Sequence, residues 1–155
     1  AAAEEAIEAY KATATNLIDE TNVTLLTDAA DIAAGSKIFA TNCATCHAAD
    51  GGGLAGPNLT DEYWIHGGGI TEIFTTIKNG VNGTAMISWK EMLGAGDMQK
   101  VSSYILSLQG TTPANPLPPQ GDKWVPEGQA SAEEGTEEVA PEAESEVPAE
   151  AGAIE

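Results

Sequence analysis

The chain contains no arginine and only six lysines against 24 acidic residues, and its formal net charge at pH 7 is −18. Nucleic-acid-binding proteins neutralise backbone phosphates with lysine and arginine, which this composition does not supply. The same imbalance argues against docking on an anionic membrane surface. We therefore expect no nucleic-acid partner and no direct binding to acidic lipid.

Large apolar residues are also scarce. Only eight of the 155 residues are aromatic, which is too few for a large self-sufficient core. No uninterrupted apolar run approaches the roughly 20 residues that cross a bilayer. The N-terminus has no basic stretch followed by an apolar one, so it is not an intact signal peptide. If the protein is exported or anchored, we expect the responsible segment to be missing from this chain.

The acidic charge is concentrated towards the C-terminus. Residues 1–112 hold 13 acidic residues and five lysines, a net charge of −8, whereas residues 113–155 hold 11 acidic residues and one lysine, a net charge of −10. A segment rich in Pro, Ala, Glu and Gly buries too little apolar surface to offset its ordering entropy. The composition predicts a Pro-rich extension over 113–130 and a disordered, solubilising acidic tail over 131–155.

Hydrophobic periodicity predicts an all-α domain over residues 28–112, preceded by a helical lead-in over residues 1–27. Helices are expected over residues 2–18, 28–43, 61–65, 70–79 and 97–108. Gly35 and Phe39 on the second of these are expected to meet Tyr104 on the last at a close helix crossing. Leu117 and Trp124 are expected to pack the Pro-rich extension on the domain.

These short helices, joined by long Gly-rich loops, make a poor core. Long irregular loops inside a compact domain normally have a functional reason. A bound cofactor that serves as the core explains both the loops and the scarcity of large apolar residues.

The segment Cys43-Ala-Thr-Cys46-His47 has the C-x-x-C-H spacing of a c-type haem attachment site. Two thiols add across the vinyl groups on one edge of the porphyrin, and the adjacent imidazole reaches the iron. Two intervening residues at a helix end bring both sulfurs and the imidazole to one face of the ring. The pattern therefore predicts one covalent haem c with His47 as the proximal ligand.

Three other readings of the two cysteines fit less well. A thioredoxin-like redox pair follows a strand in a βαβ unit, and no strand is predicted before Cys43. A zinc site usually needs a second pair of ligands, and only His66 remains. A disulfide between cysteines separated by two residues is strained.

A second axial ligand is expected from further along the chain. Met86 lies in a loop between Gly83 and Trp89, from which a thioether can reach the iron. Met92 and Met98 lie near or on helices, where methionine usually fills core space. His66 is the competing imidazole, and an open sixth position is the remaining alternative.

Further candidates follow from what a bound haem needs. The ring N–H of a ligating histidine needs an acceptor, which the carbonyl of Pro57 in Gly56-Pro-Asn-Leu59 can provide. Trp64 and Trp89 carry indole N–H donors that either reach the haem propionates or pack against the porphyrin edge.

These residues together resemble class I cytochrome c over about residues 28–110. Longer strings resemble the cytochrome c subunit (subunit III) of cbb-type haem–copper oxidases, in versions similar to those of Bacteroidetes. They are Gly56-Pro-Asn-Leu-Thr-Asp-Glu-Tyr-Trp-Ile-His-Gly-Gly68, Ile77-Lys-Asn-Gly-Val81, Met86-Ile-Ser-Trp89 and Val101-Ser-Ser-Tyr-Ile-Leu-Ser-Leu108. The resemblance implies thioethers at Cys43 and Cys46 and axial ligation by His47 and Met86.

The resemblance also implies a function. It is one-electron transfer from a quinol-oxidising complex or a soluble carrier to the core subunit of a terminal oxygen reductase, on the periplasmic side of a bacterial membrane. The implied domain is not an enzyme in isolation and is anchored through a missing N-terminal helix. We also expect it to be a monomer, and we expect its acidic charge to favour basic partner surfaces. The alternatives are a free-standing periplasmic carrier and a haem enzyme or ligand sensor with an open iron site.

Overall fold

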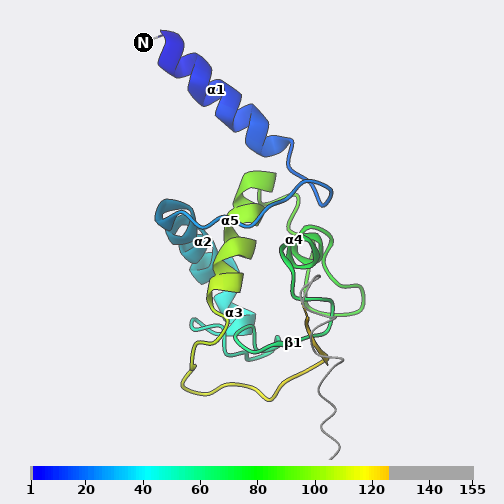
Figure 1. The fold of residues 1–155 in the computed structure, drawn as a ribbon. Helices are drawn as coiled ribbons and strands as arrows, with labels where there is room; N and C mark the ends of the chain where they lie inside the picture. Colours follow the sequence, from blue (N-terminus) through cyan, green and yellow to red (C-terminus); the bar gives the residue numbers. More distant parts are fainter. Residues whose placement is uncertain (1, 126–155) are drawn as a thin grey trace, which may run out of the picture. The chain divides into compact units, whose positions relative to one another are not determined.

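The computed structural model describes residues 2–125 (Figure 1). The predicted acidic tail over 131–155, and the end of the Pro-rich extension, lie outside the described residues. The elements are α1 (Ala2–Asn16), α2 (Ala29–Asn42), α3 (Ala44–His47), β1 (Tyr63–Trp64), α4 (Ile70–Asn79), α5 (Ala95–Ser107) and β2 (Asp122–Lys123). The described chain is thus mainly helical, as the sequence predicts, and no described helix is long and apolar enough to cross a membrane.

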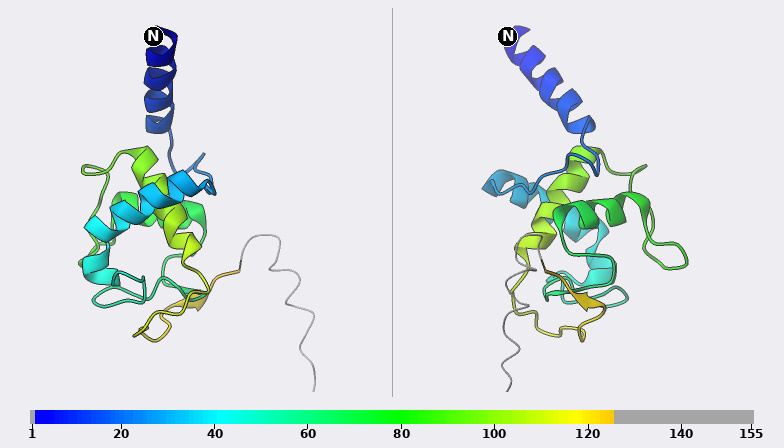
Figure 2. Two further views of the ribbon diagram at one scale, coloured as in Figure 1. Left: turned by 90° about the vertical axis from the view of Figure 1, so that its left-hand side faces the viewer. Right: turned by 45° about the vertical axis from the view of Figure 1, so that its right-hand side comes forward.

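Helix α2 crosses α5 at close range (Figure 2). A Cβ placed on Gly35 of α2 would lie 2.8 Å from the carbonyl carbon of Lys100 and closer still to its oxygen. One turn further along α2, the Phe39 ring packs on Tyr104 of α5 with ring centroids 5.4 Å apart and planes tilted by 58°. The predicted meeting of Gly35, Phe39 and Tyr104 is therefore confirmed.

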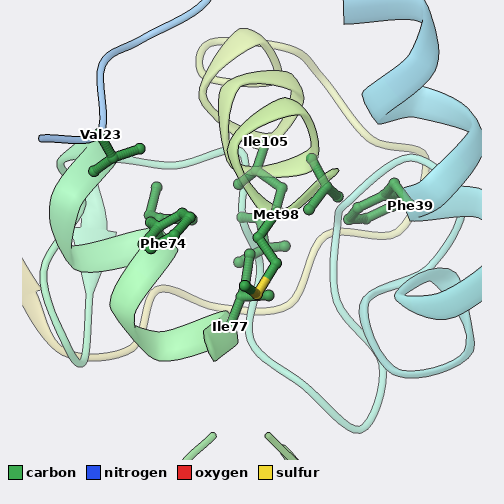
Figure 3. Packing of buried hydrophobic residues seen from close by; sticks show 9 residues of the cluster. Val23, Phe39, Phe74, Ile77, Met98 and Ile105 are labelled. Carbon is green, nitrogen blue, oxygen red and sulfur yellow. The ribbon is translucent and has the colours of Figure 1, made fainter. Parts of the chain in front are cut away.

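The hydrophobic core lies among α2, α4 and α5 (Figure 3). Its buried members are Val23, Phe39, Leu59, Ile73, Phe74, Ile77, Met98, Val101 and Ile105. The amphipathic pattern of α4 places Ile73, Phe74 and Ile77 on its buried face. The core is small, and among the described residues the aromatic side chains with almost no exposure are Phe39 and Phe74.

The segment before α2 packs on α5. Val23 is buried, the Leu26 amide donates to Ser103 Oγ at 3.0 Å, and Gln99 Nε2 donates to the Thr24 carbonyl at 2.9 Å. Lys78 of α4 also forms an ion pair with Glu20 at 2.6 Å. Residues 20–26 are therefore held to the helices of the domain.

The predicted helix over residues 61–65 is wrong. Thr60 does not cap a helix, because its backbone N–H and its hydroxyl both donate to Asn58 Oδ1, at 2.8 and 2.7 Å. The following residues form β1, which pairs antiparallel with β2 so that Tyr63 faces Lys123 and Trp64 faces Asp122. The pairing partner lies almost 60 residues further along the chain, so local propensity did not reveal it.

Candidate functional site

The attachment motif sits where α2 gives way to α3. The Cys43 N–H caps α2 by donating to the Phe39 carbonyl, and the N–H groups of Cys46 and His47 donate to the Cys43 carbonyl at 3.1 and 3.0 Å. This helical turn spaces the three side chains so that Cys43 shares a face with Cys46 and His47. Ala48, with φ of 64°, then ends α3 and turns the chain into the Gly-rich loop.

The Gly-rich loop folds back onto the motif. Gly53 N–H donates to the His47 carbonyl at 2.8 Å, and Gly56 N–H donates to the Cys46 carbonyl at 2.7 Å. Gly56 lies directly against the imidazole, since a Cβ there would come within 2.6 Å of His47 Cε1. Glycine at this position lets the backbone approach the ring, and Pro57 follows it.

The His47 ring is oriented by a single backbone contact. Its Nδ1 lies 2.9 Å from the carbonyl oxygen of Pro57. A carbonyl only accepts hydrogen bonds, so Nδ1 carries the proton and Nε2 keeps its lone pair for a metal. Burial lowers the pKa of His47, and the Pro57 carbonyl opposes this only in part. The imidazole is therefore neutral at pH 7, which is the form that binds iron.

A cavity of about 320 Å³ opens beside this imidazole, a size in the range of cofactor sites. It brings together every site residue predicted from the sequence, namely Cys43, Cys46, His47, Pro57, Trp64, Met86 and Trp89. Core side chains of α4 and α5, among them Ile73, Ile77 and Ile105, form part of its wall. No Asp, Glu or Lys is among the lining residues in the described part of the chain.

Met86 reaches the cavity from the loop between α4 and α5. The loop is closed by a hydrogen bond from Val81 N–H to the Met86 carbonyl at 2.9 Å, and Thr84 Oγ1 accepts the Met86 N–H at 3.1 Å. Met98 is buried in the core and Met92 is 55% exposed, and neither lines the cavity. The loop therefore presents Met86 alone among the three methionines.

His66, the competing imidazole, is exposed and also lines the cavity. Among the described residues, none hydrogen-bonds to its ring as the Pro57 carbonyl does to the His47 ring. Both imidazoles line the cavity, but only His47 is oriented by such a contact in the described residues.

Trp64 leaves a polar atom without a partner in the described residues. Its Nε1–H is buried and has no hydrogen-bond acceptor. Gly68 packs against this edge of the indole, because a Cβ there would lie 2.8 Å from Trp64 Cε2 and closer to Nε1. A buried N–H without an acceptor is costly, so an acceptor carried by a bound group would relieve it.

The donor set fits haem c. Cys43 and Cys46 are both free thiols, and burial together with the neighbouring Cys46 raises the pKa of Cys43 to about 11. Two thiols in one turn suit thioether attachment of a porphyrin. A neutral imidazole in the same turn and a thioether on a separate loop suit iron ligation, and a buried indole N–H suits a propionate. The uncharged wall suits the flat apolar body of a porphyrin.

Among the lining residues not predicted from the sequence are Gln120 and Asn58, both polar. Gln120 lines the cavity from the Pro-rich extension. No local pattern signals this, because the lining residues between 55 and 67 lie more than 50 residues earlier in the chain. Asn58 also lines it, buried at 7% exposure. The string Gly56-Pro-Asn-Leu59 is the local signal for Asn58.

Comparison with known proteins points to the same cofactor. Residues 30–105 match the family described as cytochrome c oxidase, cbb3-type, subunit III. A cbb3-type cytochrome c oxidase subunit FixP of Azorhizobium caulinodans is 38% identical over 91 residues, covering 54% of this chain and 31% of the relative. The subunit CcoP of Cereibacter sphaeroides is 42% identical over 89 residues, covering 54% of this chain and 29% of the relative.

A solved structure shares the fold. Cytochrome cL from the marine methylotroph Methylophaga aminisulfidivorans superposes with a TM-score of 0.51 at 27% identity, covering 54% of this chain and 56% of that one. The chain spans about three tenths of the length of the curated oxidase subunits that it matches. Residues 30–105 therefore belong to the family of cbb3-type cytochrome c oxidase subunit III, as an all-α class I cytochrome c domain whose cofactor is haem c.

Proposed function

We propose that this domain carries single electrons within a respiratory chain, as the haem c domain of a terminal oxidase subunit. The observation that carries the proposal is the convergence of Cys43, Cys46, His47 and Met86 on one cavity, with His47 oriented by the Pro57 carbonyl. Bound there, haem c supplies a one-electron Fe(III)/Fe(II) couple. The domain makes and breaks no substrate bond, so in isolation it is an electron carrier.

The predicted site residues have different tasks. The thiols of Cys43 and Cys46 would hold the porphyrin covalently, and His47 Nε2 and Met86 Sδ would ligate its iron. A thioether ligand opposite histidine raises the reduction potential relative to a second histidine. Trp64 and Trp89 line the cavity and offer indole N–H donors to the propionates or packing surface to the porphyrin edge.

The oxidase core is the proposed electron acceptor, since the matched relatives are oxidase subunits. The proposed donor is a quinol-oxidising complex or a soluble carrier. The net charge of −18 favours basic partner surfaces through long-range attraction, which weakens as salt rises. We propose that the domain works as a monomer on the periplasmic side of the cytoplasmic membrane.

Axial ligation is tested by replacing Met86 and, as a control, Met92. The Met86→Ala variant of the haem-loaded chain should lose the ferric absorption band at the red end of the spectrum that marks iron–methionine ligation. The matched control Met92→Ala removes an exposed thioether and should keep the band. If Met86→Ala kept this band, and His66→Ala instead changed the spectrum of the ferric haem, the assignment of Met86 as the ligand would be wrong.

Covalent attachment is tested independently of ligation. The denatured 155-residue chain should give one equivalent of haem by the pyridine haemochrome assay, and this haem should stay with the chain after acid–acetone extraction. Loss of all haem on extraction would contradict attachment through Cys43 and Cys46.

A further inference from the structure

Residues 110–124 follow α5 and pack against residues 52–64, and we call them the C-terminal strap. They lie beyond residues 30–105, the part that matches the oxidase subunit family. The strap is tied down along its length. Gly110 N–H donates to the Thr60 carbonyl at 2.9 Å, Trp124 N–H donates to the Glu62 carbonyl at 2.8 Å, and β2 pairs with β1.

The centre of the strap contacts the loop that orients His47. Leu117 N–H donates to the Gly52 carbonyl at 2.9 Å, and the Leu117 carbonyl accepts from Asn58 Nδ2 at 3.2 Å. The Leu117 side chain packs on Gly53, where an added Cβ would lie 2.9 Å from Leu117 Cδ1. Leu117 thus contacts the loop through its backbone N–H, its carbonyl oxygen and its side chain.

The strap is stiff where it makes these contacts. Leu117 is preceded by Pro116 and followed by Pro118 and Pro119, so it supplies the one backbone N–H in that run of four residues. Proline restricts φ, and a Pro-rich segment is extended before it binds. Little conformational entropy is lost when such a segment docks. The two hydrogen bonds of Leu117 therefore suffice to hold Gly52 and Asn58 in position.

Asn58 links the strap to the histidine. Its Oδ1 accepts from the Thr60 N–H and hydroxyl, its Nδ2 donates to Leu117, and its side chain is buried. The preceding residue is Pro57, whose carbonyl accepts from His47 Nδ1 at 2.9 Å. A shift of Asn58 therefore moves the acceptor that orients the imidazole.

We propose that the C-terminal strap, acting through Leu117 and Asn58, positions the Pro57 carbonyl against His47 and thereby tunes the reduction potential of the haem. The proposal rests on His47 being the iron ligand, as proposed above. A hydrogen bond to the second ring nitrogen raises the basicity of a ligating histidine, which favours the oxidised iron. Leu117 and Asn58 are positioning residues, and weakening their contacts raises the potential.

Two variants of the haem-loaded 155-residue chain each remove one hydrogen bond between the loop and the strap, one by a change in the loop and the other by a change in the strap. Asn58→Ser removes the donor to Leu117 but keeps an oxygen that accepts from Thr60. Leu117→Pro removes the donor to Gly52, and Leu117 does not line the haem cavity, so its effect has to travel through the strap. Leu117→Ala keeps that N–H and controls for the loss of the side chain.

The measurements are an optical redox titration and the exchange rate of the His47 Nδ1 proton in the reduced protein, followed by NMR. The chain has only two histidines, so the resonance is assigned by comparison with His66→Ala. Both variants should raise the reduction potential. Both should also speed exchange of the His47 Nδ1 proton by on the order of tenfold, the effect of losing one hydrogen bond. The double variant should change each measurement by less than the sum of the two single effects, because both hydrogen bonds are made by the same strap residue, Leu117.

The matched control is Asn115→Ser, the same chemical change at an exposed position of the same strap. It should leave both measurements at the wild-type values. Unchanged potential and exchange in haem-loaded Asn58→Ser and Leu117→Pro would overturn the proposal. If Leu117→Pro does not fold, Asn58→Ser decides by the same measurements. A chain that holds no covalent haem would instead contradict the proposed function, and the role of the strap would fall with it.

Discussion

The crossing of α2 and α5 gives a sharp test of how the fold is held together. Gly35→Ala adds one methyl group where α2 touches the backbone of α5. The new Cβ would lie 2.8 Å from Lys100 C and from Tyr104 Cβ, and closer to the Lys100 carbonyl oxygen. The clash is mainly with backbone, which cannot rotate away, so the helices have to separate. That separation also loosens the packing of Phe39 on Tyr104.

The expected magnitude combines two opposing effects. Overpacking a well-packed contact costs about 1–3 kcal/mol, and a backbone clash places this variant at the upper end. Alanine is favoured over glycine inside a helix by about 1 kcal/mol, which opposes the loss. We expect the free energy of unfolding to fall by about 2 kcal/mol. For a domain of this size the melting temperature should drop by about 8–16 °C.

The assay is denaturant unfolding of the haem-loaded chain, followed by far-ultraviolet circular dichroism. Ala33→Gly, at an exposed position of the same helix, serves as the control and should cost only the propensity of about 1 kcal/mol. Gly35 does not line the cavity, so the haem spectrum of folded Gly35→Ala should match the wild type. A variant as stable as the wild type, or more stable, would refute a close crossing.

Two further substitutions test the surroundings of the cavity. Trp64→Phe keeps an aromatic ring but removes the buried N–H. It should lower the reduction potential, because the charge of a propionate bound there would be less compensated; an unchanged potential in a redox titration would leave the indole a packing role. Gly121→Ala places a Cβ 2.7 Å from Ile65 N at φ of 86° and should destabilise the protein by about 1–2 kcal/mol or more in urea unfolding. Gly83→Ala, with φ of 78° and open space around it, should cost only the backbone strain, so equal losses would argue against tight docking of the strap.

The chemistry of the site was readable from local sequence. The spacing of Cys43, Cys46 and His47 matches a porphyrin edge within a single helical turn, so no tertiary information was needed to infer haem attachment. The apolar periodicity of residues 70–77 likewise predicted α4 and its buried face. The Gly35 and Phe39 crossing was also anticipated, because a small residue and an aromatic one turn apart suit a close helix contact.

The segment after Leu59 shows where local reasoning failed. Residues 61–65 were predicted as a helix, yet Tyr63 and Trp64 form a strand with Asp122 and Lys123. Two-residue strands carry no periodic signal, and the hydrogen bonds that define them come from the distant strap. The same long-range pairing brings Gln120 to the cavity.

The sequence by itself determined the type of cofactor, the helical class and the residues able to hold a haem, because each depends on spacings within one helix or one short string. Only the tertiary structure decided that Tyr63 and Trp64 form a strand, that Gln120 lines the cavity, and that a Pro-rich segment holds Asn58 in place. The strand pairing and the Asn58 contact join segments almost 60 residues apart. Such contacts form only after chain folding has brought the segments together, and no local pattern encodes them.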